Sequence, residues 1–141
     1  MIPAVGRVTI AMVLIASSLA GCGRSNGRYT VSGTITFDGK PVPEGGVAIE
    51  PDSAAGNRGP RAEAEIRNGR FQTAPSKGAI AGPVIIEAWG ADGVETKESP
   101  IGMVLFNNYR MKMTLPEKSS TLDIAVPLDA AAPRPKPAGS R

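Results

Sequence analysis

The chain has 141 residues, enough for one small domain with short appendages but not for two domains. It holds 17 glycines and 13 prolines but only three Phe, two Tyr and one Trp, which predicts many turns and a modest core. Residues 22–130 carry 12 basic and 13 acidic side chains, so the body lacks the massed basic face of nucleic-acid-binding proteins and we expect no nucleic-acid partner.

The first 22 residues have the parts of a secretory signal. Residues 1–7 carry one positive charge, at Arg7, and residues 8–16 (VTIAMVLIA) form a short apolar segment. A membrane-spanning helix needs about 20 apolar residues, so this segment is too short to span a bilayer. We therefore predict that residues 1–21 are a signal peptide that is cleaved, and that the protein is exported.

The end of this segment, Leu19-Ala20-Gly21-Cys22, resembles the lipobox of bacterial lipoproteins. Leu19 supplies the apolar position of the signal-peptidase recognition site, and the small Ala20 and Gly21 let the peptidase reach the bond before Cys22. A thiol is a strong nucleophile for taking up a diacylglyceryl group. The resemblance implies lipidation of Cys22 with two or three palmitate-type chains, because a single acyl chain anchors a protein only marginally.

Two further features bear on this anchor. Cys22 is the only cysteine, so it has no disulfide partner within the chain. Gly23 stands where an aspartate would retain a lipoprotein in the inner membrane, and this favours the outer membrane or the periplasmic face. The alternative is an ordinary signal peptide followed by an incidental cysteine. We expect membrane lipid to be a partner through the acylated Cys22.

The mature chain divides into three parts. Residues 22–28 (CGRSNGR) are a polar tether with two glycines. Residues 29–128 form one domain. Residues 129–141 alternate proline with basic residues and include no large apolar side chain, which is typical of a disordered or polyproline-like tail.

The domain is patterned in strands. Apolar and polar residues alternate in short runs, with Gly33 as the expected bulge or point of close approach and no sustained helical period. Asp38-Gly39 and Asn68-Gly69 predict tight turns. Residues 84–89 predict a strand that is buried except at Glu87. The predicted strands are residues 29–37, 47–49, 62–67, 71–73, 84–89, 110–115 and 122–128, and residues 103–106 are a short apolar run.

Short strands separated by Gly and Pro turns every 8 to 12 residues are typical of sandwiches and barrels. The predicted fold is all-β: a small antiparallel β-sandwich of about seven strands. An open barrel is the alternative for the same pattern.

The segment YTVSGTITFDGKPVPEGGVAIEP (29–51) resembles the first hairpin of transthyretin-like, or carboxypeptidase regulatory-like, domains, which occur in small planctomycete-type lipoproteins. The shared elements are a V-x-G-x-I strand, a D-G-x-P-V turn, and a Gly before an apolar strand that ends in Pro. Asn68-Gly69-Arg70-Phe71 is similar to a later hairpin of the same domains. The resemblance implies a prealbumin-like sandwich with Phe37 and Phe71 on its inner faces and no active site.

The sequence lacks the residues that the most common catalytic sites use. There is no histidine, and the sole cysteine is assigned to lipid, which excludes Ser-His-Asp and Cys-His catalysis and the usual zinc sites. Glu63 and Glu65 lie two apart on one predicted strand and are interpreted as a solvated face. We expect a protein that is not an enzyme and carries no metal or cofactor.

Two functions therefore stay open. The first is a structural or protein-interaction role at the cell envelope. The second is a carbohydrate-binding module, because exposed aromatic side chains stack on sugar faces, and here Trp89 is the candidate ligand contact. Against this, a lone tryptophan at the end of a buried-looking strand is more typical of a core or rim residue. Envelope proteins or glycans are the expected partners.

Overall fold

The computed structural model describes residues 26–133. The predicted signal peptide, its recognition residues 19–21 and Cys22 lie outside the described residues, as does the end of the predicted tail. The elements in chain order are β1 (Arg28–Tyr29), β2 (Val31–Phe37), β3 (Lys40–Pro41), β4 (Glu44–Pro51), η1 (Ser53–Ala55), β5 (Ala62–Arg67), β6 (Arg70–Gln72), β7 (Ala79–Ile80), β8 (Gly82–Ala91), β9 (Val104–Leu115), β10 (Ser120–Val126) and η2 (Leu128–Ala130).

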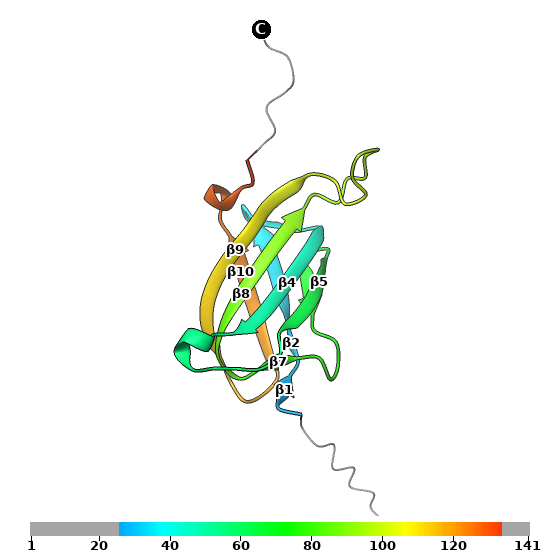
Figure 1. Ribbon diagram of the computed structural model, residues 1–141. Helices are drawn as coiled ribbons and strands as arrows, with labels where there is room; N and C mark the ends of the chain where they lie inside the picture. Colours follow the sequence, from blue (N-terminus) through cyan, green and yellow to red (C-terminus); the bar gives the residue numbers. More distant parts are fainter. Residues whose placement is uncertain (1–25, 134–141) are drawn as a thin grey trace, which may run out of the picture.

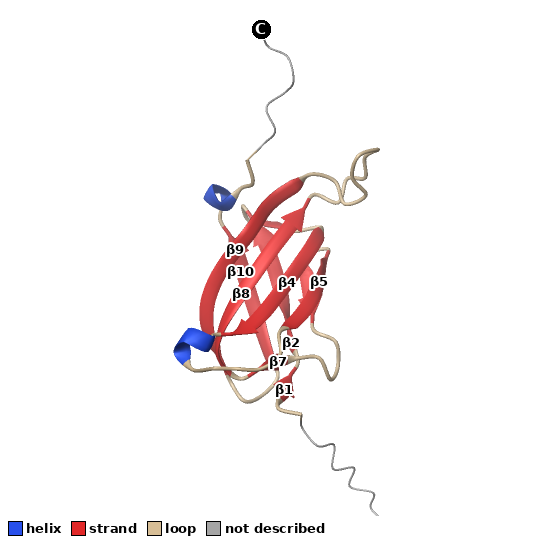
Figure 2. Ribbon diagram, in the orientation of Figure 1, coloured by secondary structure: helices blue, strands red, loops and turns tan. Residues whose placement is uncertain are grey.

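The strands form one curled sheet in the order β10-β2-β6-β5-β4-β8-β9, with β3 paired to β2. The curl gives two layers: β5, β4, β8 and β9 lie in front in Figure 1, and β2 and β10 lie behind them. Strands β1 and β7 pair as a separate two-stranded sheet, and the only helical segments among the described residues are the two short 3-10 turns in Figure 2. The predicted all-β sandwich is confirmed. No helix within residues 26–133 has the length and apolar character needed to cross a membrane.

The core lies between the two layers. Alternate residues of β2, β4 and β8 face inward, which is the geometry that a period-two pattern predicts. Phe106 of β9 is fully buried, and its ring stacks on Phe37 of β2 with a centroid separation of 5.5 Å. Phe71 is also buried, as the resemblance implies.

Two tight turns close the hairpins that the sequence predicts. Asp38 and Gly39 have φ values of 50° and 75°, and Asn68 and Gly69 have φ values of 48° and 75°. Two successive positive φ angles are the signature of type I′ turns, whose twist matches that of the flanking strands. The β2–β3 and β5–β6 hairpins follow from these two dipeptides.

The pairing of β10 differs from the antiparallel prediction. β10 runs parallel to β2, in register from Ser120 opposite Val31 to Val126 opposite Phe37. The short connection after β9 carries the chain to the other layer, so β10 meets β2 in the same direction. At Gly33, a Cβ atom would collide with the backbone carbonyl of Leu122, so the predicted point of close approach is confirmed.

Strand β8 also corrects a prediction. Val84, Ile86 and Ala88 are buried, whereas Trp89 is exposed. The sequence pattern predicts that residues 84–89 are buried except at Glu87, but only one face of the strand meets the core. Three consecutive apolar residues at the start of the strand hide the period of two.

Strand β9 joins two segments that the sequence pattern separates. Its residues 104–115 form one strand, and Asn107 and Asn108 lie opposite a single residue of β8 at a shift in register. This β-bulge interrupts the alternation of apolar residues and explains why the pattern breaks there. Beyond Leu128, a bridge joins Phe106 to Ala131, so the domain continues past the predicted start of the tail at residue 129.

We expect Asn57→Ala to destabilise the domain by about 1–3 kcal/mol. The Asn57 side-chain amide donates to the carbonyls of Ala81 and Pro83 at 3.0 and 2.8 Å, and its loss removes a donor from both, although the Pro83 carbonyl keeps the Asp52 backbone N–H. Urea unfolding followed by circular dichroism measures the change. Arg58→Ala, at the exposed neighbouring position, is the control and should stay within about 0.5 kcal/mol of the native protein.

Candidate functional site

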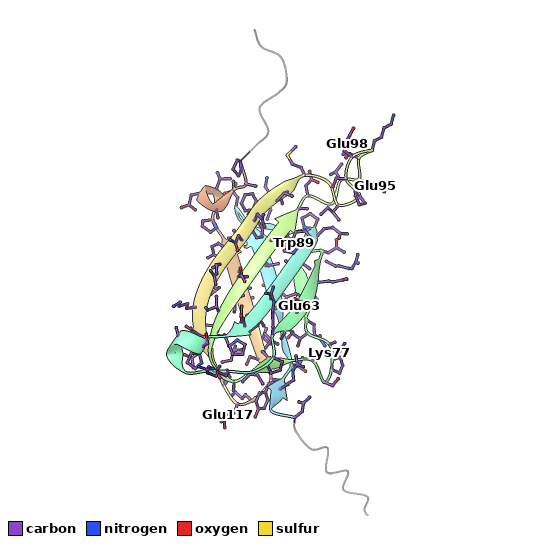
Figure 3. All side chains as sticks on the ribbon, in the orientation of Figure 1. Glu63, Lys77, Trp89, Glu95, Glu98 and Glu117 are labelled. Atoms are coloured by element: carbon purple, nitrogen blue, oxygen red, sulfur yellow. The ribbon has the colours of Figure 1, made fainter. Side chains whose placement is uncertain are left out.

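The outer face of the front layer carries a groove of about 490 Å³, whose lining includes Gly46, Ala48, Glu63, Glu65, Trp89 and Asn107. We call it the Trp89 groove. Its volume is within the usual range for small-molecule sites. Figure 3 shows Trp89 and Glu63 on the same face of the sheet, away from the loop of Glu95 and Glu98 at one end of the domain.

The floor of the groove is strand β4. Its outward positions Gly46 and Ala48 have small side chains or none, while both neighbouring strands carry long ones. Gly46 lies between Glu65 of β5 and Trp89 of β8. Ala48 lies between Glu63 and Glu87 in the next row. Small residues on the central strand therefore create a trough between two raised rows.

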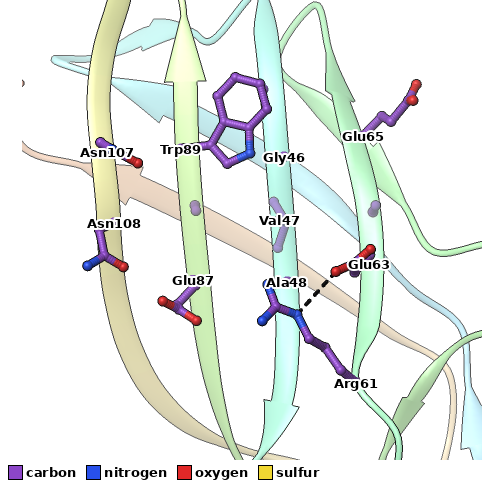
Figure 4. Close-up of a pocket in the computed structure, with 13 residues that line it drawn as sticks. Gly46, Val47, Ala48, Arg61, Glu63, Glu65, Glu87, Trp89, Asn107 and Asn108 are labelled. Carbon is purple, nitrogen blue, oxygen red and sulfur yellow. Dashed lines mark ion pairs between the residues drawn. The ribbon is translucent and has the colours of Figure 1, made fainter.

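The indole of Trp89 lies over Gly46. A Cβ atom at Gly46 would be 2.6 Å from the indole Nε1, so only glycine leaves room for the ring in this position. Figure 4 shows the ring between β8 and β4, with its nitrogen toward Gly46 and its flat face turned outward. The side chain is 38% exposed, and its N–H group has no hydrogen-bond partner within the described part of the chain.

The carboxylates of the groove are paired with arginines. These pairs fix the direction of the carboxylate groups, although exposed pairs of this kind add little to stability. The N···O distances are 3.2 Å for Arg61–Glu63, 3.1 Å for Arg67–Glu65 and 3.7 Å for Arg110–Glu87. Arg61 lies beside Ala48 in Figure 4, with its ion pair to Glu63 dashed.

The far rim is made by the bulge in β9. Asn108 has a φ of 57°, a conformation that asparagine tolerates better than most residues. The extra residue places two exposed amide side chains, Asn107 and Asn108, beside Trp89. Bulges often redirect side chains in this way near binding sites.

This arrangement is suited to binding. No group of acidic residues, cysteines or histidines within residues 26–133 could hold a metal ion. Glu63 and Glu65 are exposed and paired with arginines, which agrees with the predicted solvated face. The groove instead offers a flat aromatic surface, hydrogen-bond acceptors on one side and amides on the other.

Of the predicted site residues, the structure describes only Trp89. Sequence reasoning missed Gly46, Asn107 and Asn108. The pair Gly45-Gly46 within an apolar strand indicates a close approach, but only the register of β4 with β8 shows that Gly46 meets Trp89. Comparison with known proteins finds no matching family model and no similar curated protein.

We expect Gly46→Ala to displace the indole. The added methyl group collides with Nε1, so the ring must turn toward solvent. Trp89 is the only tryptophan, so its fluorescence reports this movement as a red shift and as stronger quenching by acrylamide. Stability should change by about 1 kcal/mol or less, because alanine costs less entropy than glycine in a strand. Gly56→Asn, a residue that tolerates the φ of 82° at this open position, should leave the emission unchanged.

Proposed function

We propose that the protein is an exported lipoprotein held in the cell envelope by acylated Cys22, and that its non-catalytic sandwich serves a structural or protein-interaction role. The observation that carries the anchor is the Leu19-Ala20-Gly21-Cys22 segment directly after a short apolar run. The outer or periplasmic membrane face is the proposed location, since Gly23 replaces the retaining aspartate.

The absence of histidine from the sequence supports a role in binding. A protein without histidine, and with its one cysteine assigned to lipid, lacks the common nucleophile and base pairs. The Trp89 groove supports the same role. It is a preformed surface, and the positions of its side chains are explained without a catalytic reaction. We also propose that the sandwich is of the transthyretin-like type, on the basis of residues 29–51 and the two Gly-containing turns.

The anchor is tested by Cys22→Ser in a lipoprotein-competent bacterium supplied with an alkyne fatty acid. The native protein should take up label and sediment with membranes, and the variant should do neither, because serine lacks the thiol that accepts the diacylglyceryl group. Ser18→Ala is the matched control, since it lies outside the four-residue signal and should keep both label and sedimentation. An unlabelled native protein would contradict the proposal.

Carbohydrate binding is the second candidate function. It is favoured by one observation, the outward-facing and partly exposed ring of Trp89 on the surface of the sheet. A tryptophan buried in the core could not contact a sugar, so the exposure of Trp89 is what favours this function.

A further inference from the structure

We propose that the Trp89 groove binds a neutral saccharide, one ring of which stacks on the outward face of the indole. This inference rests on the proposed function of the domain as an envelope binding module, and it names the ligand class. It is carried by the combination of a flat exposed aromatic ring, paired carboxylates on one side and amides on the other.

Stacking requires a flat ring that is accessible and held in place. The absence of a side chain at Gly46 lets the indole lie against the sheet, so its broad face and not its edge meets solvent. The ring is supported by β8 and β4, which are paired over eight residues, and this limits its movement. A large aromatic side chain held on a rigid element offers contact area at little cost in conformational entropy.

Hydrogen-bonding groups flank the ring in one row across the sheet. Neighbouring strands are about 4.8 Å apart, so Glu65 of β5 lies about 10 Å from Trp89, and Asn107 of β9 lies on its other side. Figure 4 shows the Glu65 carboxylate turned away from Trp89 and Asn107 beside the ring, so a sugar ring above the indole has an amide toward one edge. The amide both donates hydrogen bonds to hydroxyl groups and accepts them.

A second row extends the site along the trough. Glu63 and Glu87 flank Ala48 as Glu65 and Trp89 flank Gly46, and Arg61 adds a donor beside them. Residues two apart along a strand are separated by about 7 Å, so this row lies within reach of a neighbouring sugar unit. The groove therefore fits a short oligosaccharide better than a single ring.

The charges of the lining select a neutral ligand. Each of the three carboxylates in the lining, Glu63, Glu65 and Glu87, is paired with an arginine. A charged ligand of either sign therefore meets no unpaired opposite charge among these groups. A purely apolar ligand would cover charged groups without replacing the hydrogen bonds that they make with water. A neutral polyhydroxylated ring satisfies these groups and presents C–H faces to the indole.

The experiment uses the whole mature protein in a zwitterionic detergent without a sugar headgroup. Neutral hexasaccharides built from glucose, xylose, mannose or N-acetylglucosamine are titrated while the emission of the sole tryptophan is recorded. At least one should shift the emission to the blue and protect Trp89 from acrylamide. If none does so up to millimolar concentrations, the inference is overturned.

Variants locate the binding site. Glu63→Gln and Asn107→Ala keep the fluorophore and should each weaken binding of the saccharide about tenfold, while the exposed Thr121→Ala on β10 should bind like the native protein. On an array of the same saccharides, Trp89→Ala should lose retention. Binding that survives Trp89→Ala would place the ligand elsewhere and overturn the inference.

The two proposals fail separately. If acyl label is found on Cys22 but no saccharide binds, the envelope role stands and its partner is a protein or a structural neighbour. If saccharide binds at Trp89 but Cys22 carries no lipid, the ligand class stands and the anchored role does not.

Discussion

Phe106→Ala should lower the free energy of unfolding by about 3–5 kcal/mol, the range measured when a buried aromatic side chain is truncated. Phe106 is 0% exposed, and its ring stacks on Phe37. The ring also packs so closely against Gly90 that a Cβ atom there would be 2.5 Å from its Cε1 atom. Because the ring is fully buried between strands of a paired sheet, its truncation leaves a cavity in the core.

Urea unfolding followed by circular dichroism measures this effect. Val104→Ala is the matched control, because it removes an apolar side chain from the same strand at a position that is 42% exposed. That variant should lose about 0.5 kcal/mol or less. Equal losses in the two variants would contradict the placement of Phe106 at the centre of the core.

Gly33→Ala should destabilise the domain by about 3 kcal/mol, at the upper end of the usual cost of overpacking. The added Cβ atom collides with the backbone oxygen of Leu122, on the strand that runs parallel to β2. A backbone carbonyl held in a ladder of seven paired residues cannot turn aside as a flexible side chain can. The substitution therefore separates β10 from β2 or bends both strands.

Gly39→Asn is the control for this substitution. Gly39 has a φ of 75°, and a Cβ atom added there would meet nothing within 4 Å. Asparagine tolerates this backbone conformation, so the control should lose about 1 kcal/mol or less. Hydrogen exchange gives a second measurement: amides of β10 should lose protection in Gly33→Ala and keep it in the control.

Local features of the fold could be predicted from the sequence. The strand around Ile35 alternates cleanly, and the Asp38-Gly39 and Asn68-Gly69 turns depend only on the residues within them. The parallel pairing of β10 with β2 could not be predicted in this way. This pairing joins segments from opposite ends of the domain. The alternation of apolar and polar residues indicates which face of a strand is buried, but it does not indicate which strand pairs with it.

The candidate site was less predictable than the fold. Trp89 follows a run in which Val84, Ile85 and Ile86 are all apolar, so the sequence does not show which alternate positions face the core. Its outward direction depends on the register of β8 with β4, and its flat position depends on Gly46. Both are properties of the assembled sheet.

Mass spectrometry of the mature N-terminal peptide tests most directly whether Cys22 anchors the protein in a membrane, as we propose. The protein is expressed in a lipoprotein-competent bacterium and extracted from its membranes. We predict a chain that begins at Cys22 and carries a diacylglyceryl group on its sulfur. A chain that begins at another residue, or a Cys22 with a free thiol, would contradict the claim.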